Sequence, residues 1–153
     1  MISNDQTEQT TSEISFADLN RAVTAMDGAA LRFLLEAMAS RDVEITKEPE
    51  TGLVMMNVTD CFNTDFHLGE VLVTTAEVRL GNQRGWGMIM GDDGERALLL
   101  AGIDVILRDA ANLFGKEIRA ELAKWLAKAE TKLLGERRRA AATRVNFQTM
   151  ATE

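Results

Sequence analysis

Apolar and polar positions near the N-terminus follow the spacing of an amphipathic helix. The apolar positions recur three or four residues apart, at Phe16, Leu19, Val23 and Met26. This spacing places them on one helix face. Ser15 stands at the predicted N-cap, and Asp27-Gly28 is typical of a break. A second helix is predicted from about Ala29, and the short connection favours a helical hairpin.

The apolar period falls to two after Arg41, which predicts β-strands. Alternating or continuous apolar runs place strands over residues 43–46, 53–58, 67–80 and 86–90. Turn residues separate these strands at 48–52, 60–65 and 81–85. Because short turns join antiparallel strands, we expect an antiparallel sheet of three to five strands.

Helical spacing returns in the last third of the chain. We expect one helix from about Glu95 to Ala111 and a longer helix after Gly115, with Gly135 as its end or a kink. The residues from Ala140 onward have an extended pattern. The predicted fold is therefore α+β, with an N-terminal helix pair, the antiparallel sheet, two C-terminal helices packed on the sheet and a short extended tail.

Composition indicates one domain with an uneven charge. Residues 1–14 are predicted to be a disordered arm, and residues 15–153 a single domain. The net charge is −7, but residues 1–114 hold 8 Lys/Arg and 19 Asp/Glu, whereas residues 115–153 hold 9 and 5. The acidic body argues against nucleic-acid binding, because it would repel the phosphates.

Three features predict a cytoplasmic protein that is not in a membrane. No apolar run approaches the ~18 residues that a membrane helix needs. The segment from Met1 to Glu13 lacks the basic start and apolar stretch of a secretory signal. The single cysteine, Cys61, permits no internal disulfide and suits a reducing compartment.

Glycines and carboxylates give no complete catalytic motif. After Gly85 and Gly87, a dinucleotide-binding loop needs a third glycine where Met90 stands, so we expect these glycines to form the hairpin and permit close packing. Asp92 and Asp93 are suited to Mg²⁺ or acid–base chemistry, but their place before a helix favours capping.

The other chemically reactive side chains also fall short of a site. A local hydrogen bond is expected for Asp104. His67 and Cys61 are too few to fill a tetrahedral zinc site, and a strand-edge histidine and a half-buried cysteine are expected instead. We therefore predict no catalytic residue, no metal site and no cofactor in this chain.

The basic C-terminal part carries the candidate contacts. Lys124, Lys128 and Lys132 form a ridge on one helix face, for which a solvated face is the favoured interpretation. Four arginines are candidate contacts for a phosphate group or an acidic partner, although a solvated helix face explains them equally well: Arg137, Arg138, Arg139 and Arg144.

The last residues alternate apolar and polar positions. Val145, Phe147 and Met150 form a candidate assembly segment. Such a segment can add a strand to its own sheet or to that of a partner.

An ordered set of short motifs resembles the PhnG family, the G subunit of the bacterial carbon–phosphorus lyase system. The set comprises Glu50-Thr51-Gly52-Leu53, Phe66-x-Leu68-Gly69-Glu70 with the alternation that continues to Leu80, Gly85 to Asp93 with Ala97, Ala101 and Asp104, and Thr143-x-Val145-x-Phe147-x-Thr149-Met150. The resemblance covers roughly residues 16–151. It departs from the family at Arg21, which no Trp-Met pair follows.

The resemblance implies a function that the residue patterns do not supply. Family members join the H, I and J subunits in a complex with two copies of each. That complex forms alpha-D-ribose 1-methylphosphonate 5-triphosphate from ATP and methylphosphonate and releases adenine, so ATP is a substrate of the complex. The nucleosidase-type chemistry is assigned to the I subunit, and no catalytic residue is assigned within the G family.

Three functions follow as hypotheses. The first is a non-catalytic subunit of this transferase complex, which also associates with itself. The second is a polyphosphate-binding module that contributes its arginines to a shared active site. The third is an independent small enzyme that uses Asp92, Asp93 and a metal ion.

Overall fold

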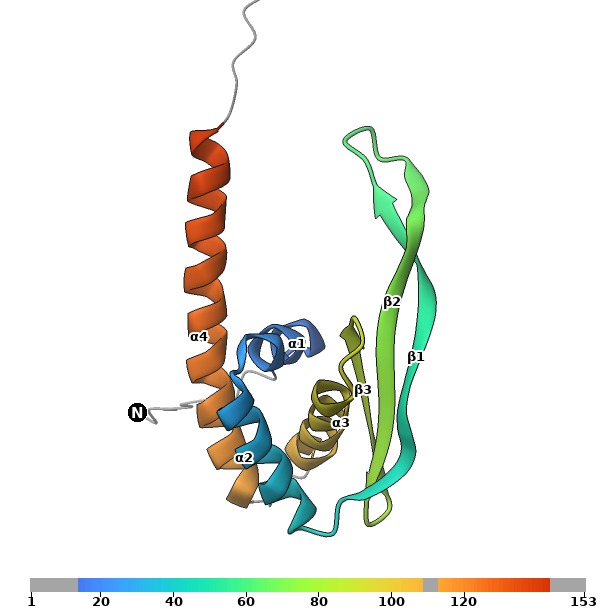
Figure 1. Cartoon of the computed structure of the whole chain (residues 1–153), viewed down its shortest axis with the longest axis vertical. Coiled ribbons are helices and arrows are strands. Elements are labelled where there is room, and N and C mark those ends of the chain that lie inside the picture. The colour runs from blue at the N-terminus through green and yellow to red at the C-terminus, as the bar shows by residue number, and fades with distance from the viewer. Residues whose placement is uncertain (1–13, 109–112, 144–153) are drawn as a thin grey trace, which may run out of the picture.

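The computed structural model describes residues 14–108 and 113–143. In these residues four helices and a three-stranded antiparallel sheet follow one another in the predicted α+β order (Figure 1). The elements are α1 (Phe16–Ala25), α2 (Gly28–Ala39), β1 (Glu44–Thr59), β2 (Asp65–Leu80), β3 (Gln83–Met90), α3 (Gly94–Arg108) and α4 (Leu113–Ala142). The fold class is confirmed.

The sheet consists of one long hairpin and one short strand. Its order is β1-β2-β3, and β1 pairs with β2 from Glu44↔Arg79 to Thr59↔Asp65. Strand β3 pairs only with the second half of β2, from Val73↔Met90 to Leu80↔Gln83. The β1–β2 hairpin therefore extends well beyond the end of β3.

The predicted turn at residues 48–52 is wrong, because these residues lie inside β1. The ladder absorbs the extra residues as register shifts between Ile45 and Lys47 and between Lys47 and Glu50. Such bulges accommodate Pro49, which has no N–H to donate.

At the foot of the hairpin, Arg79 donates to Glu44 across the strands at 2.5 Å. This hydrogen bond and the charge of Glu44 raise the pKa of Arg79.

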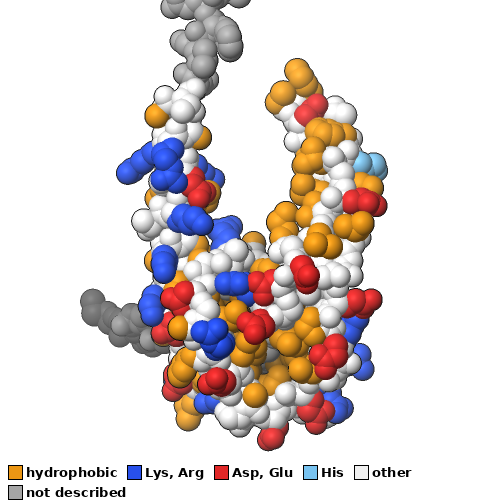
Figure 2. All heavy atoms as spheres, in the orientation of Figure 1, with side chains coloured by type: hydrophobic (Ala, Val, Ile, Leu, Met, Phe, Trp, Pro, Cys, Tyr) orange, Lys and Arg blue, Asp and Glu red, His pale blue; other side chains and the backbone are white. Residues whose placement is uncertain are grey.

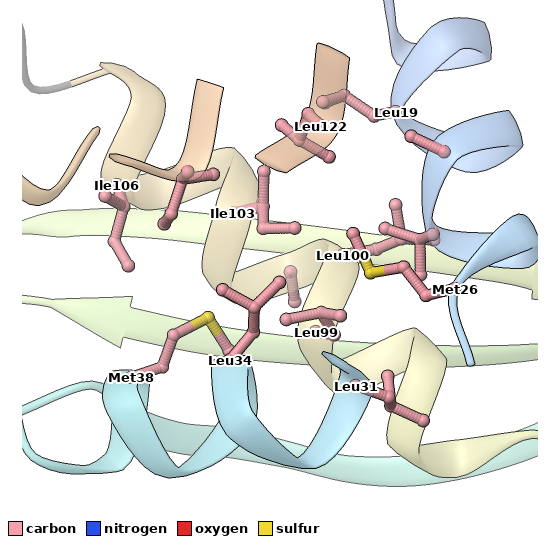
Figure 3. Packing of buried hydrophobic residues seen from close by; sticks show 14 of the residues in the cluster. Leu19, Met26, Leu31, Leu34, Met38, Leu99, Leu100, Ile103, Ile106 and Leu122 are labelled. Atoms are coloured by element: carbon pink, nitrogen blue, oxygen red, sulfur yellow. The ribbon is translucent and has the colours of Figure 1, made fainter. Parts of the chain in front are cut away.

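Helix α3 forms the centre of the core. Its residues Leu99, Leu100 and Ile103 are fully buried. Figure 3 shows them between the sheet and the side chains of Leu31, Leu34 and Met38 from α2 and Leu19 and Leu122 from α1 and α4. Thus α3 lies directly on the sheet, and α4 packs against α1 and α3.

Two glycines let α3 lie this close to β3. A Cβ atom at Gly85 would stand 2.1 Å from the main-chain oxygen of Ala101, and one at Gly87 would stand 2.2 Å from that of Ala97. Only hydrogen fits at such distances, because van der Waals contact between heavy atoms needs about 3.5 Å. The predicted close packing of these glycines is confirmed, but both lie inside β3 rather than in the hairpin turn.

Polar side chains fix the ends of the helices. Ser15 caps α1 by accepting from the N–H of Asp18, and Asp27 caps α2 by accepting from that of Ala30. The predicted cap at Ser15 is confirmed. Such caps each contribute roughly 1 kcal/mol.

Helix α4 is one continuous helix from Leu113 to Ala142. The predicted end at Gly135 is wrong, and the helix begins at Leu113, before Gly115 rather than after it. A single glycine costs a helix only about 1 kcal/mol, and no proline follows Gly135, so the ladder continues through it. The extended pattern predicted from Ala140 is wrong for residues 140–142, which belong to α4, and residues 144–153 lie outside the described residues.

Candidate interaction surface

Two arms project from the core in the same direction. The hairpin arm comprises residues 50–72. Most of this part of β1 and β2 lies beyond the end of β3. The helical arm comprises residues 130–143, beyond the last α4 side chains that pack into the core. Figure 1 shows both arms rising from the core, and Figure 2 shows open space between them.

The hairpin arm exposes apolar side chains along its whole length. Leu53 is 61% exposed, Met55 53% and Leu68 57%, and Phe62 at the turn is 84% exposed. Val54, Phe66 and Leu72 are also exposed. Figure 2 shows hydrophobic side chains running up this arm to its tip. Isolated two-stranded hairpins are marginally stable, and a contiguous exposed apolar surface typically marks an interaction site.

The two arms carry opposite charges. The hairpin arm has four carboxylates, Glu50, Asp60, Asp65 and Glu70, and no lysine or arginine. The helical arm has two glutamates and four cations, which are Lys132, Arg137, Arg138 and Arg139. Figure 2 shows the blue side chains concentrated on the helical arm. The acidic hairpin arm therefore suits a basic partner surface, and the basic helical arm suits an acidic one.

A groove of about 450 Å³ lies at the foot of the helical arm. Its apolar floor includes Ile89 and Leu133, and Met90 at the end of β3 is 67% exposed. Arg21 from α1 and Lys132 from α4 line the same groove. Glu136 from α4 lines it as well, so basic and acidic side chains both border this apolar groove.

The predicted arginines do not converge on one point. Arg137, Arg138 and Arg139 are exposed and consecutive on α4, and successive helical residues point about 100° apart. None of the three lines the groove. The fourth predicted arginine, Arg144, lies outside the described residues, as do the assembly candidates Val145, Phe147 and Met150.

The lysine ridge is tied to an aromatic ring. The Nζ of Lys128 lies 4.2 Å from the centroid of the Trp125 ring, and that of Lys124 lies 5.7 Å away. Both lysines are exposed, whereas Trp125 is 4% exposed. The ridge is a solvated helix face with cation–π contacts to its own tryptophan.

The carboxylates considered for chemistry are engaged in local structure. Asp93 accepts from the N–H of Arg96 at 3.0 Å and pairs with the guanidinium of Arg96 at 2.6 Å, so the predicted cap is confirmed. Asp104 accepts from the N–H of Trp86 at 3.0 Å and pairs with Arg108. In the described residues, no three His, Cys, Asp or Glu side chains are grouped as metal ligands would be.

His67 and Cys61 both lie on the hairpin arm. His67 stands in β2 opposite Asn57, and its Nδ1 is hydrogen-bonded to the Asn57 side chain. Cys61 is exposed in the turn between β1 and β2, so the expected half-burial is wrong. The turn places the thiol at the tip of an arm, where no core residue can cover it.

The hairpin arm is the feature that sequence reasoning missed. Its signal was present, because apolar residues occupy both strand faces at Leu53, Val54 and Met55, and Phe62 stands in the loop. A strand with both faces apolar reads as a buried strand. The arm instead leaves both faces open.

Comparisons with known proteins identify the family. A search of curated proteins finds no match. Among the described parts of the chain, no helix combines the length and apolar character needed to cross a membrane. The family model "Phosphonate metabolism protein PhnG" matches residues 17–152. The chain therefore belongs to the PhnG family and has a role in phosphonate metabolism.

Proposed function

We propose that this chain is a non-catalytic, assembling subunit of the carbon–phosphorus lyase core complex. It joins the H, I and J subunits and assists the formation of alpha-D-ribose 1-methylphosphonate 5-triphosphate from ATP and methylphosphonate, with release of adenine. The chain acts in the cytoplasm and brings no cofactor of its own.

The hairpin arm is the observation that carries this proposal. Its apolar side chains are not part of the core cluster, and Leu53 and Leu68 are more than half exposed. Hydrophobic stabilisation amounts to roughly 25 cal/mol for each Å² of apolar surface removed from water. A partner that covers both faces of the arm thus supplies the stabilisation that the hairpin lacks alone.

Co-expression with the H, I and J subunits tests assembly. The intact chain is expected to co-purify with them, and a double variant of the arm, Leu53→Ser with Leu68→Ser, is expected to co-purify at least tenfold less. Phe33→Ser is the matched control, because Phe33 is 66% exposed on α2, away from both arms. Soluble chains that never co-purify would refute the proposal.

A second candidate function is a polyphosphate contact through the helical arm. The exposure of three consecutive arginines favours it, because guanidinium groups recognise phosphate oxygens well. Their divergent directions limit the contact to one or two of them unless another subunit completes the site. Replacing Arg137, Arg138 and Arg139 by glutamine in the assembled complex distinguishes this candidate from pure assembly. Unchanged ATP affinity and turnover would exclude it.

A further inference from the structure

The main-chain edge of β2 beside the end of β3 is unpaired in the described structure. β3 pairs with β2 only from Val73 onward, and the last hydrogen bond beyond this ladder runs from the N–H of Gly91 to the oxygen of Leu72 at 2.9 Å. Residues 65–67 and 69–71 pair with β1 on their other side, with a β-bulge at Leu68. An edge of this kind is a template for another strand.

Parity along the strand identifies the groups that face this edge. Leu72 points its carbonyl toward the side of β3, because it accepts from Gly91 there. Residues two apart in a strand direct their N–H and C=O groups to the same side. The N–H and C=O of Glu70 therefore face the open edge, and no register shift intervenes between Leu72 and Glu70.

Apolar side chains flank the open edge on both faces. Leu72 and Val71 point to opposite faces of the sheet, and their partners across β1 are Leu53 and Val54. All four belong to the hairpin arm, and Leu53, Val54 and Leu72 are more than 40% exposed. A strand laid along the edge would gain main-chain hydrogen bonds and would bury these side chains with its own alternating residues.

We propose that the β2 edge from Asp65 to Val71 is a strand-addition site for a basic, alternately apolar segment of another protein. The segment would lie on the same side of β2 as β3, beyond the end of β3. The inference rests on the proposed assembly function, since it names the surface and the type of partner segment.

Charge identifies the occupant. Asp65 and Glu70 lie on the edge strand itself, and the hairpin arm contains no lysine or arginine. A segment with lysine or arginine at its polar positions is therefore favoured. A second copy that paired through its own β2 edge would place two acidic strands side by side, and the repulsion between their like charges disfavours this pairing.

Hydrogen exchange followed by NMR on the full chain tests the site. The probe is a ten-residue peptide that alternates valine and lysine, with a valine–glutamate peptide as its charge-reversed control. The lysine peptide is expected to slow exchange of the Glu70 amide at least tenfold, and the glutamate peptide to slow it much less. No protection, or equal protection by both peptides, would overturn the proposal.

Matched proline variants locate the binding edge. Met55 stands directly opposite Glu70, so its N–H faces the outer edge of β1. Glu70→Pro is expected to abolish peptide binding, whereas Met55→Pro is expected to keep it. Thermal unfolding verifies that both variants fold, and Glu70→Lys, which retains the N–H, is expected to weaken binding at least threefold. Equal binding by all three variants would overturn the proposal.

Four further outcomes separate the alternatives. Faster exchange of residues 65–71 after deletion of residues 144–153 would assign the edge to the chain's own C-terminus and overturn the proposal. Protection that rises with protein concentration, together with a dimer in sedimentation, would assign it to a second copy and also overturn it. In the assembled complex, an unprotected edge refutes this inference alone. If no complex forms but the lysine peptide binds, only the assembly function fails.

Discussion

The guanidinium of Arg108 lies 2.7 Å from the carboxylate of Asp104, one turn earlier on α3, and together they cover the outer edge of β3 at Arg84 and Trp86. Asp104 accepts from the N–H of Trp86, and Arg108 donates to the oxygen of Arg84, each at 3.0 Å. These are the main-chain groups that a fourth strand would have paired. The ion pair thus protects one edge of the sheet, while the β2 edge beyond β3 has no such cover in the described residues.

Removal of this cover is expected to cost stability and solubility. Asp104→Ala leaves the N–H of Trp86 and the charge of Arg108 without their partner, which should lower the free energy of unfolding by about 1–2 kcal/mol. Urea denaturation measures this loss, and light scattering should detect more aggregation through the exposed edge. The control is Glu121→Ala, which removes a surface pair with Lys124 and should change stability by less than about 0.5 kcal/mol.

A methyl group on β3 is expected to separate helix and sheet. Gly87→Ala places a Cβ 2.2 Å from the oxygen of Ala97, so α3 must shift and the free energy of unfolding should fall by about 3 kcal/mol or more. Gly52→Ala is the matched control, because nothing lies within 4 Å of its Cβ position on the hairpin arm. Thermal and urea unfolding compare the two. A Gly87→Ala variant as stable as Gly52→Ala would contradict the packing described for α3.

Arg96 is expected to hold the N-terminal helix pair on the core. Its guanidinium donates to the oxygens of Val23 and Met26 at the end of α1, at 3.1 and 2.7 Å. Hydrogen bonds from a charged donor contribute about 1.5–3 kcal/mol, so Arg96→Ala should destabilise the fold by about that amount. Arg96→Lys, which has the charge without the planar fork, should recover only part of it. Equal stability of wild type and both variants in urea would refute this role.

Cys61 is expected to report assembly. The chain has one cysteine, which lies exposed in the turn of the hairpin arm. In the free native chain the thiol should react with a maleimide as fast as in the unfolded chain, within about threefold. In a complex that covers the hairpin tip, labelling should slow at least tenfold. A rate unchanged by assembly would place the partner away from the tip.

Local chemistry explains which parts of the fold could be predicted from the sequence. Ser15, Asp93 and Gly85 act through neighbours in sequence or through close packing, and their roles were predicted. The turn expected at residues 48–52 failed because β-bulges accept Pro49 without ending the strand. The end expected at Gly135 failed because nothing after it stops the helix.

The candidate site was less predictable than the fold. Exposure of Leu53 and Met55 depends on how far the helices extend over the sheet, which is a relation between elements rather than a local pattern. Asp104 makes the expected local bond, with Arg108 four residues later, but its second partner, the N–H of Trp86, lies 18 residues earlier on β3. Pairings between elements were therefore beyond what periodicity can show.

Because α4 is unbroken, the helical arm tilts as one rigid unit, and a small tilt at its base moves its tip. A helix rises 1.5 Å per residue, so residues 130–142 extend about 20 Å from the core, and a tilt of about 10° at their base moves the tip by about 3 Å. That displacement matches the length of one hydrogen bond. The tilt of the helical arm thus sets the positions of Arg137, Arg138 and Arg139 as much as their own rotamers do. A subunit that contacts the arm near Lys132 would therefore fix the positions of all three guanidinium groups together.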